Sequence, residues 1–312
     1  MSASICEIHN IARVPAPAAL SLGKFFVCPK CIAEDDFDPK RGTKHEYEWG
    51  DHYGSSCVVC GEGDQHPNHY RTGDASIDRT QPGERWAFNA DVARVFDNML
   101  VRSIPEYVAM RQLVFNLGCQ FWSEAYDRAE VSVVDLGASR GEALAPFVEK
   151  FGIKSRYVGV EISDPMLAEL RKRFVSSGPA VDVEKLDLRS AYPNKPAWLT
   201  LAILTLQFIP IEYRQRVIAD AYRNTLLSGG LIVVEKVLGS SSVFDHIFLT
   251  EYYAMKQANG YTPEDIDRKR LSLEGVLVPQ TAASTERMLE AEGFRVERFW
   301  QWCNFVGWIA IK

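Results

Sequence analysis

Long uninterrupted apolar segments are absent from this 312-residue sequence. A membrane-spanning helix needs about 20 consecutive, mainly apolar residues, so we expect no membrane association. The first residues, MSASICEIHNIARVPAP, also lack the basic stretch and following apolar stretch of a secretory signal. We therefore expect a cytoplasmic protein.

An excess of positive charge is also lacking. Lys and Arg number 35 against 41 Asp and Glu, and residues 1–84 hold 8 basic against 13 acidic residues. A nucleic-acid-binding surface usually carries a strong basic excess, so the composition disfavours nucleic acid as a partner without excluding it. We expect instead a small-molecule substrate, a protein partner for the acidic segment 1–84, and a homodimer.

Cysteine is scarce after residue 60, because five of the seven cysteines lie within the first 60 residues. In a chain without an export signal, paired cysteines at short spacing favour metal over disulfides. A gap of two residues lets a turn direct both ligand atoms at one tetrahedral zinc ion. Four such pairs predict two closed zinc sites, whose ligands are Cys6, His9, Cys28, Cys31, Cys57, Cys60, His66 and His69. A single site formed by the four cysteines of the two CxxC pairs is the alternative.

The segment around these pairs is small and polar, and it would gain little stability from apolar burial alone. Metal is therefore its expected organiser. Closed sites leave no open coordination position, so we assign this zinc no catalytic role. We predict a zinc-binding module and linker over residues 1–84, followed by a second domain over residues 85–312.

The second domain alternates between strand-like and helix-like segments. Residues 88–124 have helical spacing that is broken at Pro105. Predicted strands lie at 131–137, 157–163, 181–187, 199–208 and 229–236, with helices between them. This rhythm predicts an α/β fold with a doubly wound, mostly parallel sheet and helices on both faces. Its ligand is expected outside the carboxyl ends of the strands, where the strand order reverses.

Three of these strand ends carry residues suited to a nucleoside. In VVDLGASRG (133–141), Asp135 precedes a turn in which Gly137 and Gly141 permit close backbone approach. Glu161 ends the next strand, where an acid can hold both ribose hydroxyls, and Asp187 ends the third, near an adenine amino group. NAD is the rival ligand, but the turn lacks the GxGxxG spacing that suits a pyrophosphate. S-adenosylmethionine carries no phosphate and is the ligand that we expect.

Several longer segments resemble one family, the carboxy-S-adenosylmethionine synthases. They are WAFNADVARVFDNMLVRSIPEY (86–107), LTLQFIP (204–210), LSGGLIVVEK (227–236), KQANGYTPEDIDRKRLSLEGV (256–276) and CNFVGWIAIK (303–312). The similarity extends from Trp86 to the C-terminus. It implies a class I methyltransferase (Rossmann-like) fold, and an enzyme that converts S-adenosylmethionine and prephenate into carboxy-S-adenosylmethionine and phenylpyruvate. Ordinary members lack the N-terminal zinc-binding domain.

The resemblance also implies roles for individual residues. Gly137, Ala138 and Ser139 would line the methionine part of the cofactor. Glu161 and Ile162 would lie at the ribose, and Asp187 and Leu188 at the adenine. Tyr107 and Arg270 would hold the extra carboxylate, since a guanidinium binds a carboxylate through two parallel hydrogen bonds and a phenol adds one donor.

This sequence departs from the family at two positions of the site. Ile203 stands where the family has an asparagine near the methionine part, and Ala138 stands where it has a cysteine. The loss of a polar side chain at Ile203 leaves two alternatives open. One is a methyl- or carboxymethyltransferase that acts on a macromolecule presented by the zinc module. The other is an assembly component that binds the cofactor, S-adenosylmethionine or its carboxylated form, without turnover.

Overall fold

The computed structural model describes residues 84–123, 132–175 and 180–312, together with the backbone of three short strand pairs. The pairs join β1 (Ile5–Cys6) to β2 (Ile11–Ala12), β3 (Val14–Pro15) to β4 (Phe26–Val27), and β5 (Phe37–Asp38) to β6 (Gly42–Thr43). The chain forms two compact units, of which one comprises residues 1–77, 95–109 and 255–263 and the other comprises the rest. Within the described ranges, no helix is long and apolar enough to cross a membrane.

The larger unit is built on one mixed sheet with the strand order β13-β14-β11-β10-β7-β8-β9. All neighbours from β11 to β9 pair in parallel, whereas β14 runs antiparallel to β11 and β13 runs antiparallel to β14. The mostly parallel sheet is therefore confirmed. Its strands are β7 (Ser132–Leu136), β8 (Arg156–Glu161), β9 (Val181–Lys185), β10 (Ala197–Ile203), β11 (Thr225–Leu238), β13 (Arg295–Trp302) and β14 (Phe305–Ile311), and β12 (Gln280–Thr281) pairs with the end of β11.

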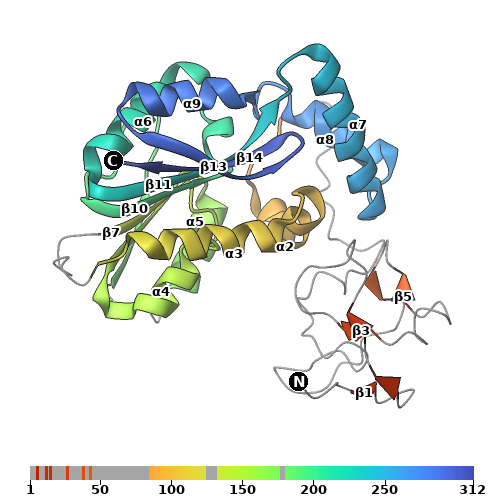
Figure 1. The fold of residues 1–312 in the computed structure, drawn as a ribbon, viewed down its shortest axis with the longest axis horizontal. Coiled ribbons are helices and arrows are strands. Elements are labelled where there is room, and N and C mark those ends of the chain that lie inside the picture. The colour runs from red at the N-terminus through yellow and green to blue at the C-terminus, as the bar shows by residue number, and fades with distance from the viewer. Residues whose placement is uncertain are drawn as a thin grey trace. The chain divides into compact units, whose positions relative to one another are not determined.

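Helices precede and connect these strands. Pro105 lies between the helix Ala90–Ser103 and the helix Tyr107–Gly118, as its lack of a backbone N–H predicts. Figure 1 shows α6 and α9 on one face of the sheet and α3 and α4 on the other. The helices are α2 (Ala90–Ser103), α3 (Tyr107–Gly118), α4 (Ala145–Phe151), α5 (Asp164–Arg173), α6 (Ile211–Asn224), α7 (Ser242–Ala258), α8 (Pro263–Leu273) and α9 (Ala282–Ala291).

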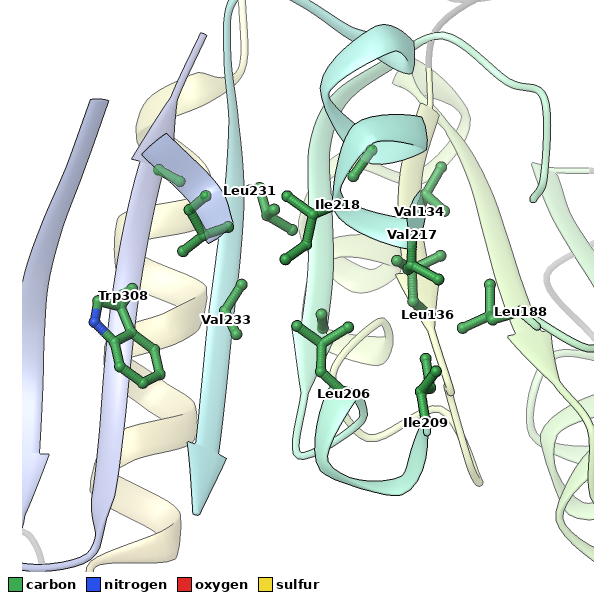
Figure 2. Close-up of a cluster of buried hydrophobic side chains, with 14 of the residues drawn as sticks. Val134, Leu136, Leu188, Leu206, Ile209, Val217, Ile218, Leu231, Val233 and Trp308 are labelled. Carbon is green, nitrogen blue, oxygen red and sulfur yellow. The ribbon is translucent and has the colours of Figure 1, made fainter. Parts of the chain in front are cut away.

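The core lies between the sheet and the helices that cover it. Val217 and Ile218 of α6 pack against strand residues such as Val134 and Val233, all of them at most 1% exposed. Figure 2 shows this cluster extending from Leu188, past Leu136 on β7, to Trp308 on β14. Burial of such side chains is worth roughly 1.5–3 kcal/mol each, and it fixes the central strands whose ends carry the site.

The strand predicted over residues 199–208 is shorter than expected. β10 ends at Ile203, and a 3-10 turn follows over Leu206–Phe208. Leu204 has a φ of +60°, which turns the chain out of the sheet. The apolar run LTLAILTLQF contains no sequence signal for this break, because the groups that stabilise the turn come from a distant strand.

Candidate functional site

The carboxyl ends of β7, β8, β9 and β10 carry most of the predicted site residues. The chain leaves β7 toward β8 and β9 on one side, and β10 pairs with β7 on the other. The strand order therefore reverses between β7 and β10, and ligands of doubly wound sheets bind in the crevice at such a point. The strand order thus reverses where the sequence predicts the ligand, and the position of the ligand itself stays a prediction.

The glycine turn after β7 requires unusual backbone conformations. Gly137 and Gly141 have φ values of +70° and +86°, which side chains disfavour. A Cβ atom on Gly137 would lie 2.7 Å from Cγ2 of Thr205, so the turn is packed closely against the loop after β10. Thr205 also donates its hydroxyl to the carbonyl oxygen of Leu136 at 2.7 Å. The turn after β7 and the loop after β10 are thus held together by close packing and by a hydrogen bond.

Glu161 fixes the other side of the glycine turn. Its Oε2 accepts the backbone N–H of Ser139 at 2.9 Å, and its Oε1 accepts those of Ile162 and Ser163 at 2.8 Å each. Burial raises the pKa of this carboxyl, and the three N–H groups oppose that rise. A carboxylate offers about four lone-pair directions, so Oε2 retains room for one ribose hydroxyl. Sequence reasoning assigned this acid two hydroxyls and missed its backbone partners.

Asp135 is a buried acid beside the glycine turn. It is 2% exposed, and its Oδ2 has no hydrogen-bond partner within the described residues. Burial raises the pKa of Asp135 to about 7, Arg111 opposes the rise, and the negative charges of Glu142 and Glu161 add to it. A buried oxygen that lacks a partner is costly. A cationic ligand group would supply one, and S-adenosylmethionine carries both an ammonium and a sulfonium.

The residues predicted at the adenine are engaged with the protein itself. Asp187 binds the Arg189 guanidinium, with Oδ2 at 2.7 Å from Nη2, and this contact lowers its pKa. Leu188 is 8% exposed and belongs to the apolar core. Ile162, by contrast, is 49% exposed at the end of β8 and offers an apolar surface. An adenine role for Asp187 therefore requires it to share its carboxylate with Arg189.

Four residues near the carboxyl ends of β10 and β11 were not predicted from the sequence as site residues. They are Thr205, Gln207, Glu235 and Lys236. Both oxygens of the buried Glu235 carboxylate accept N–H groups from the loop after β10, with Thr205 at 3.0 Å, Leu206 at 2.8 Å and Gln207 at 2.7 Å. Burial raises the pKa of Glu235 to about 8, and these N–H groups and Arg214 oppose the rise. The only sequence signal was a charged pair that follows the apolar run LIVV.

The residues predicted to hold a carboxylate lie on two helices. Tyr107 is half-buried and begins α3. Arg270 lies on α8, where its guanidinium donates to Asp267 and Glu274 of the same helix at 3.4 and 3.1 Å. Its side chain is 46% exposed. The carboxylate-binding role of both residues stays a prediction.

The predicted zinc ligands lie outside the residues whose side chains the structure describes. Cys6 belongs to β1, of which only the backbone is described. In the ranges 84–123, 132–175 and 180–312, no group of three His, Cys, Asp or Glu residues could hold a metal ion. The predicted domain boundary near residue 84 also stays a prediction.

Similarity to known proteins bears on the family to which this chain belongs. A methyltransferase domain family matches residues 133–230. The carboxy-S-adenosyl-L-methionine synthase of Methylococcus capsulatus is 38% identical over 73% of this chain and 93% of its own length, and that of Wolinella succinogenes is 35% identical over 73% and 94%. Among solved structures, an O-methyltransferase family protein from Burkholderia thailandensis is 16% identical, covers 72% of this chain and 60% of its own, and has a TM-score of 0.49.

The larger unit thus combines a class I methyltransferase strand order with a glycine turn and buried acids at the reversal of that order. The similarity to the curated relatives extends over 93% and 94% of their own length. The chain is an S-adenosylmethionine-dependent transferase, and it belongs to the carboxy-S-adenosyl-L-methionine synthase family.

Proposed function

We propose that this protein converts S-adenosylmethionine and prephenate into carboxy-S-adenosylmethionine and phenylpyruvate. The observation that carries the proposal furthest is the buried Asp135 carboxylate, whose Oδ2 lacks a partner in the described part of the chain. It lies directly before the glycine turn, where a cationic methionine moiety would neutralise it. Family membership supports the same reaction.

The nucleoside is assigned to three neighbouring strand ends. Gly137, Ala138 and Ser139 line the methionine part, and Asp135 and Gly141 flank them. Glu161 and Ile162 contact the ribose, and Asp187 and Leu188 contact the adenine. Ile203 is also assigned to the methionine part. It ends β10, which lies beside β7 on the side away from β8.

The chemistry places few demands on general bases in the protein. The positive sulfonium acidifies its methyl group, which gives up a proton and forms a carbon–carbon bond to the carbon dioxide that prephenate releases. The hydroxide that leaves the prephenate ring takes the proton. The protein then contributes chiefly by positioning the reactants and stabilising charge. Arg270 and Tyr107 are assigned to the new carboxylate.

Cofactor binding should depend on the ionisation of Asp135. Its pKa of about 7 means that the carboxylate forms as the pH rises through 7, and a cationic ligand prefers that form. Affinity for S-adenosylmethionine should therefore fall about tenfold between pH 8 and pH 6. Calorimetric titrations at a series of pH values measure this change. Asp135→Asn should give a shallower profile, and a wild-type profile equally shallow would contradict the role of Asp135.

The N-terminal module is assigned two structural zinc sites. The eight Cys and His residues of the four pairs supply the two sets of four ligands that closed sites require. Purified protein should contain between about one and two zinc equivalents by elemental analysis. Cys28→Ser or Cys57→Ser should lower the zinc content, whereas Cys119→Ser, a free cysteine outside the module, should not. Full-length protein without zinc would contradict the assignment.

One observation favours a second candidate function. Ile203 is an apolar residue at the position where the resemblance implies an asparagine, so the methionine or acceptor pocket differs there. The alternative is a methyl- or carboxymethyltransferase with a macromolecular acceptor. Mass spectrometry of the ligand that co-purifies with the protein tests the choice. Carboxy-S-adenosylmethionine supports the synthase or a carboxymethyltransferase, and S-adenosylmethionine alone supports a methyltransferase.

A further inference from the structure

Lys236 lies on β11, at the edge of the sheet that carries the site, and no nucleoside contact is assigned to this strand. It is near the carboxyl end of β11, and its backbone N–H donates to Oε1 of Gln207, in the loop after β10, at 2.8 Å. The nucleoside groups are assigned to β7, β8 and β9. The ends of β10 and β11 form the other side of the strand-order reversal, where ligands of such sheets bind.

Successive side chains of a strand point to opposite faces, and this separates Lys236 from its neighbour Glu235. Glu235 binds the loop Thr205–Gln207. The Lys236 ammonium lies instead over the ring of Tyr252, 4.6 Å from its centroid. Tyr252 is 7% exposed and packs against Phe305 of β14 with ring centroids 5.5 Å apart. The ammonium thus packs against a buried aromatic ring.

The charge of Lys236 is incompletely compensated. Within the described residues, no carboxylate forms an ion pair with it, and Asp245, the acidic group whose charge acts on it, already accepts the N–H of Gly239 at 2.9 Å. Burial lowers the pKa of Lys236 to about 8, and Asp245 opposes the change. At neutral pH the side chain is largely charged. A partly desolvated ammonium without a carboxylate is costly, and such groups concentrate at functional sites.

We propose that Lys236 binds a carboxylate of the acidic co-substrate and holds it at the ends of β10 and β11. This inference rests on the proposed function, since it assigns a subsite to the dicarboxylic acid of that reaction. A substrate carboxylate at this position would form the ion pair that Asp245 does not form with Lys236. The co-substrate would then approach the methionine part of S-adenosylmethionine from β10 and β11, which lie on the other side of β7 from the strand β8 that carries Glu161.

The test compares Lys236→Met with a matched control, Lys312→Met. Lys312 also places its ammonium 4.6 Å from the centre of a tyrosine ring, that of Tyr222, but it lies beyond β14 and pairs with Gly229 near the opposite end of the sheet. We expect Lys236→Met to raise the KM for prephenate about 30-fold or more, as for the removal of one partner of a buried charge pair. The calorimetric Kd for S-adenosylmethionine should change less than about twofold. Lys236→Arg should restore part of the loss, and Lys312→Met should behave as wild type.

Each outcome decides between the claims. An unchanged KM in Lys236→Met overturns the carboxylate subsite and leaves the proposed function intact. A second outcome is that wild-type protein binds prephenate in calorimetry, that Lys236→Met binds it more weakly, and that wild type forms no carboxy-S-adenosylmethionine. This outcome overturns the proposed function and leaves the subsite intact. Wild-type protein that neither binds nor converts prephenate overturns both. Lys236→Gln serves as a second variant if Lys236→Met does not fold.

Discussion

Replacement of Arg270 by alanine should weaken the binding of carboxy-S-adenosylmethionine by about 2–3 kcal/mol and leave that of S-adenosylmethionine nearly unchanged. The difference arises because only the first ligand carries a carboxylate for the guanidinium. We place the effect at the lower end of the range for charge pairs, since Arg270 is half-exposed and must leave Asp267 and Glu274. Exposed pairs of that kind contribute about 0–1 kcal/mol each, so their loss costs little.

Parallel calorimetric titrations with both ligands measure this selectivity. Arg268→Ala is the matched control, because Arg268 lies on the same helix and pairs with Asp265 in the same way. Arg270→Lys should recover only part of the affinity, since an ammonium lacks the two-pronged contact. Equal losses for both ligands would show that Arg270 is structural. No loss for either would show that the site does not bind the extra carboxylate through this residue.

Replacement of Glu235 by alanine should lower the free energy of unfolding by about 3–5 kcal/mol. The variant would leave three buried N–H groups without their acceptor and release the loop after β10 from β11. Urea unfolding followed by tryptophan fluorescence measures the change. Glu297→Ala, on an exposed part of β13, should alter the free energy of unfolding by less than about 0.5 kcal/mol. A loss for Glu235→Ala as small as this control would contradict the role of the loop contacts.

The pH dependence of stability gives the same residue a second signature. The pKa of Glu235 is about 8 in the folded protein and near its ordinary value of 4.5 in the unfolded chain. The folded state therefore binds the proton more tightly, and this group's contribution to stability falls as the pH rises from about 4.5 to about 8. Asp135 contributes in the same direction up to about pH 7. Glu235→Gln should make the decline smaller than in wild type.

The sequence was sufficient for the five parallel strands β7 to β11 and for the residues at the ends of the first three, whereas β12, β13 and β14 were not predicted as strands. Buried parallel strands are recognisable as short apolar runs, and Asp135, Glu161 and Asp187 were visible because each follows such a run. The end of β10 was not visible in this way. Leu204 leaves the strand with a positive φ, and the turn that follows is stabilised by Glu235, which lies about 30 residues further along the chain. A local pattern contains no information on such a contact.

The partners of the site acids were likewise hidden. The position of Glu161 suggested contact with both ribose hydroxyls, but three backbone N–H groups occupy most of its oxygens. The contact between Asp187 and Arg189 was overlooked even though only one residue separates them in the sequence. Tyr107 and Arg270 were identified from the family resemblance alone, because neither follows a strand of the sheet.

The most direct test of the proposed synthase activity is an incubation of purified protein with S-adenosylmethionine and prephenate whose ring carboxylate carries carbon-13. The proposed reaction predicts carboxy-S-adenosylmethionine that contains the label in its new carboxylate, with phenylpyruvate formed in equal amount. Mass spectrometry of both products measures this directly. Phenylpyruvate without labelled carboxy-S-adenosylmethionine, or neither product from protein that binds S-adenosylmethionine, would contradict the proposed reaction.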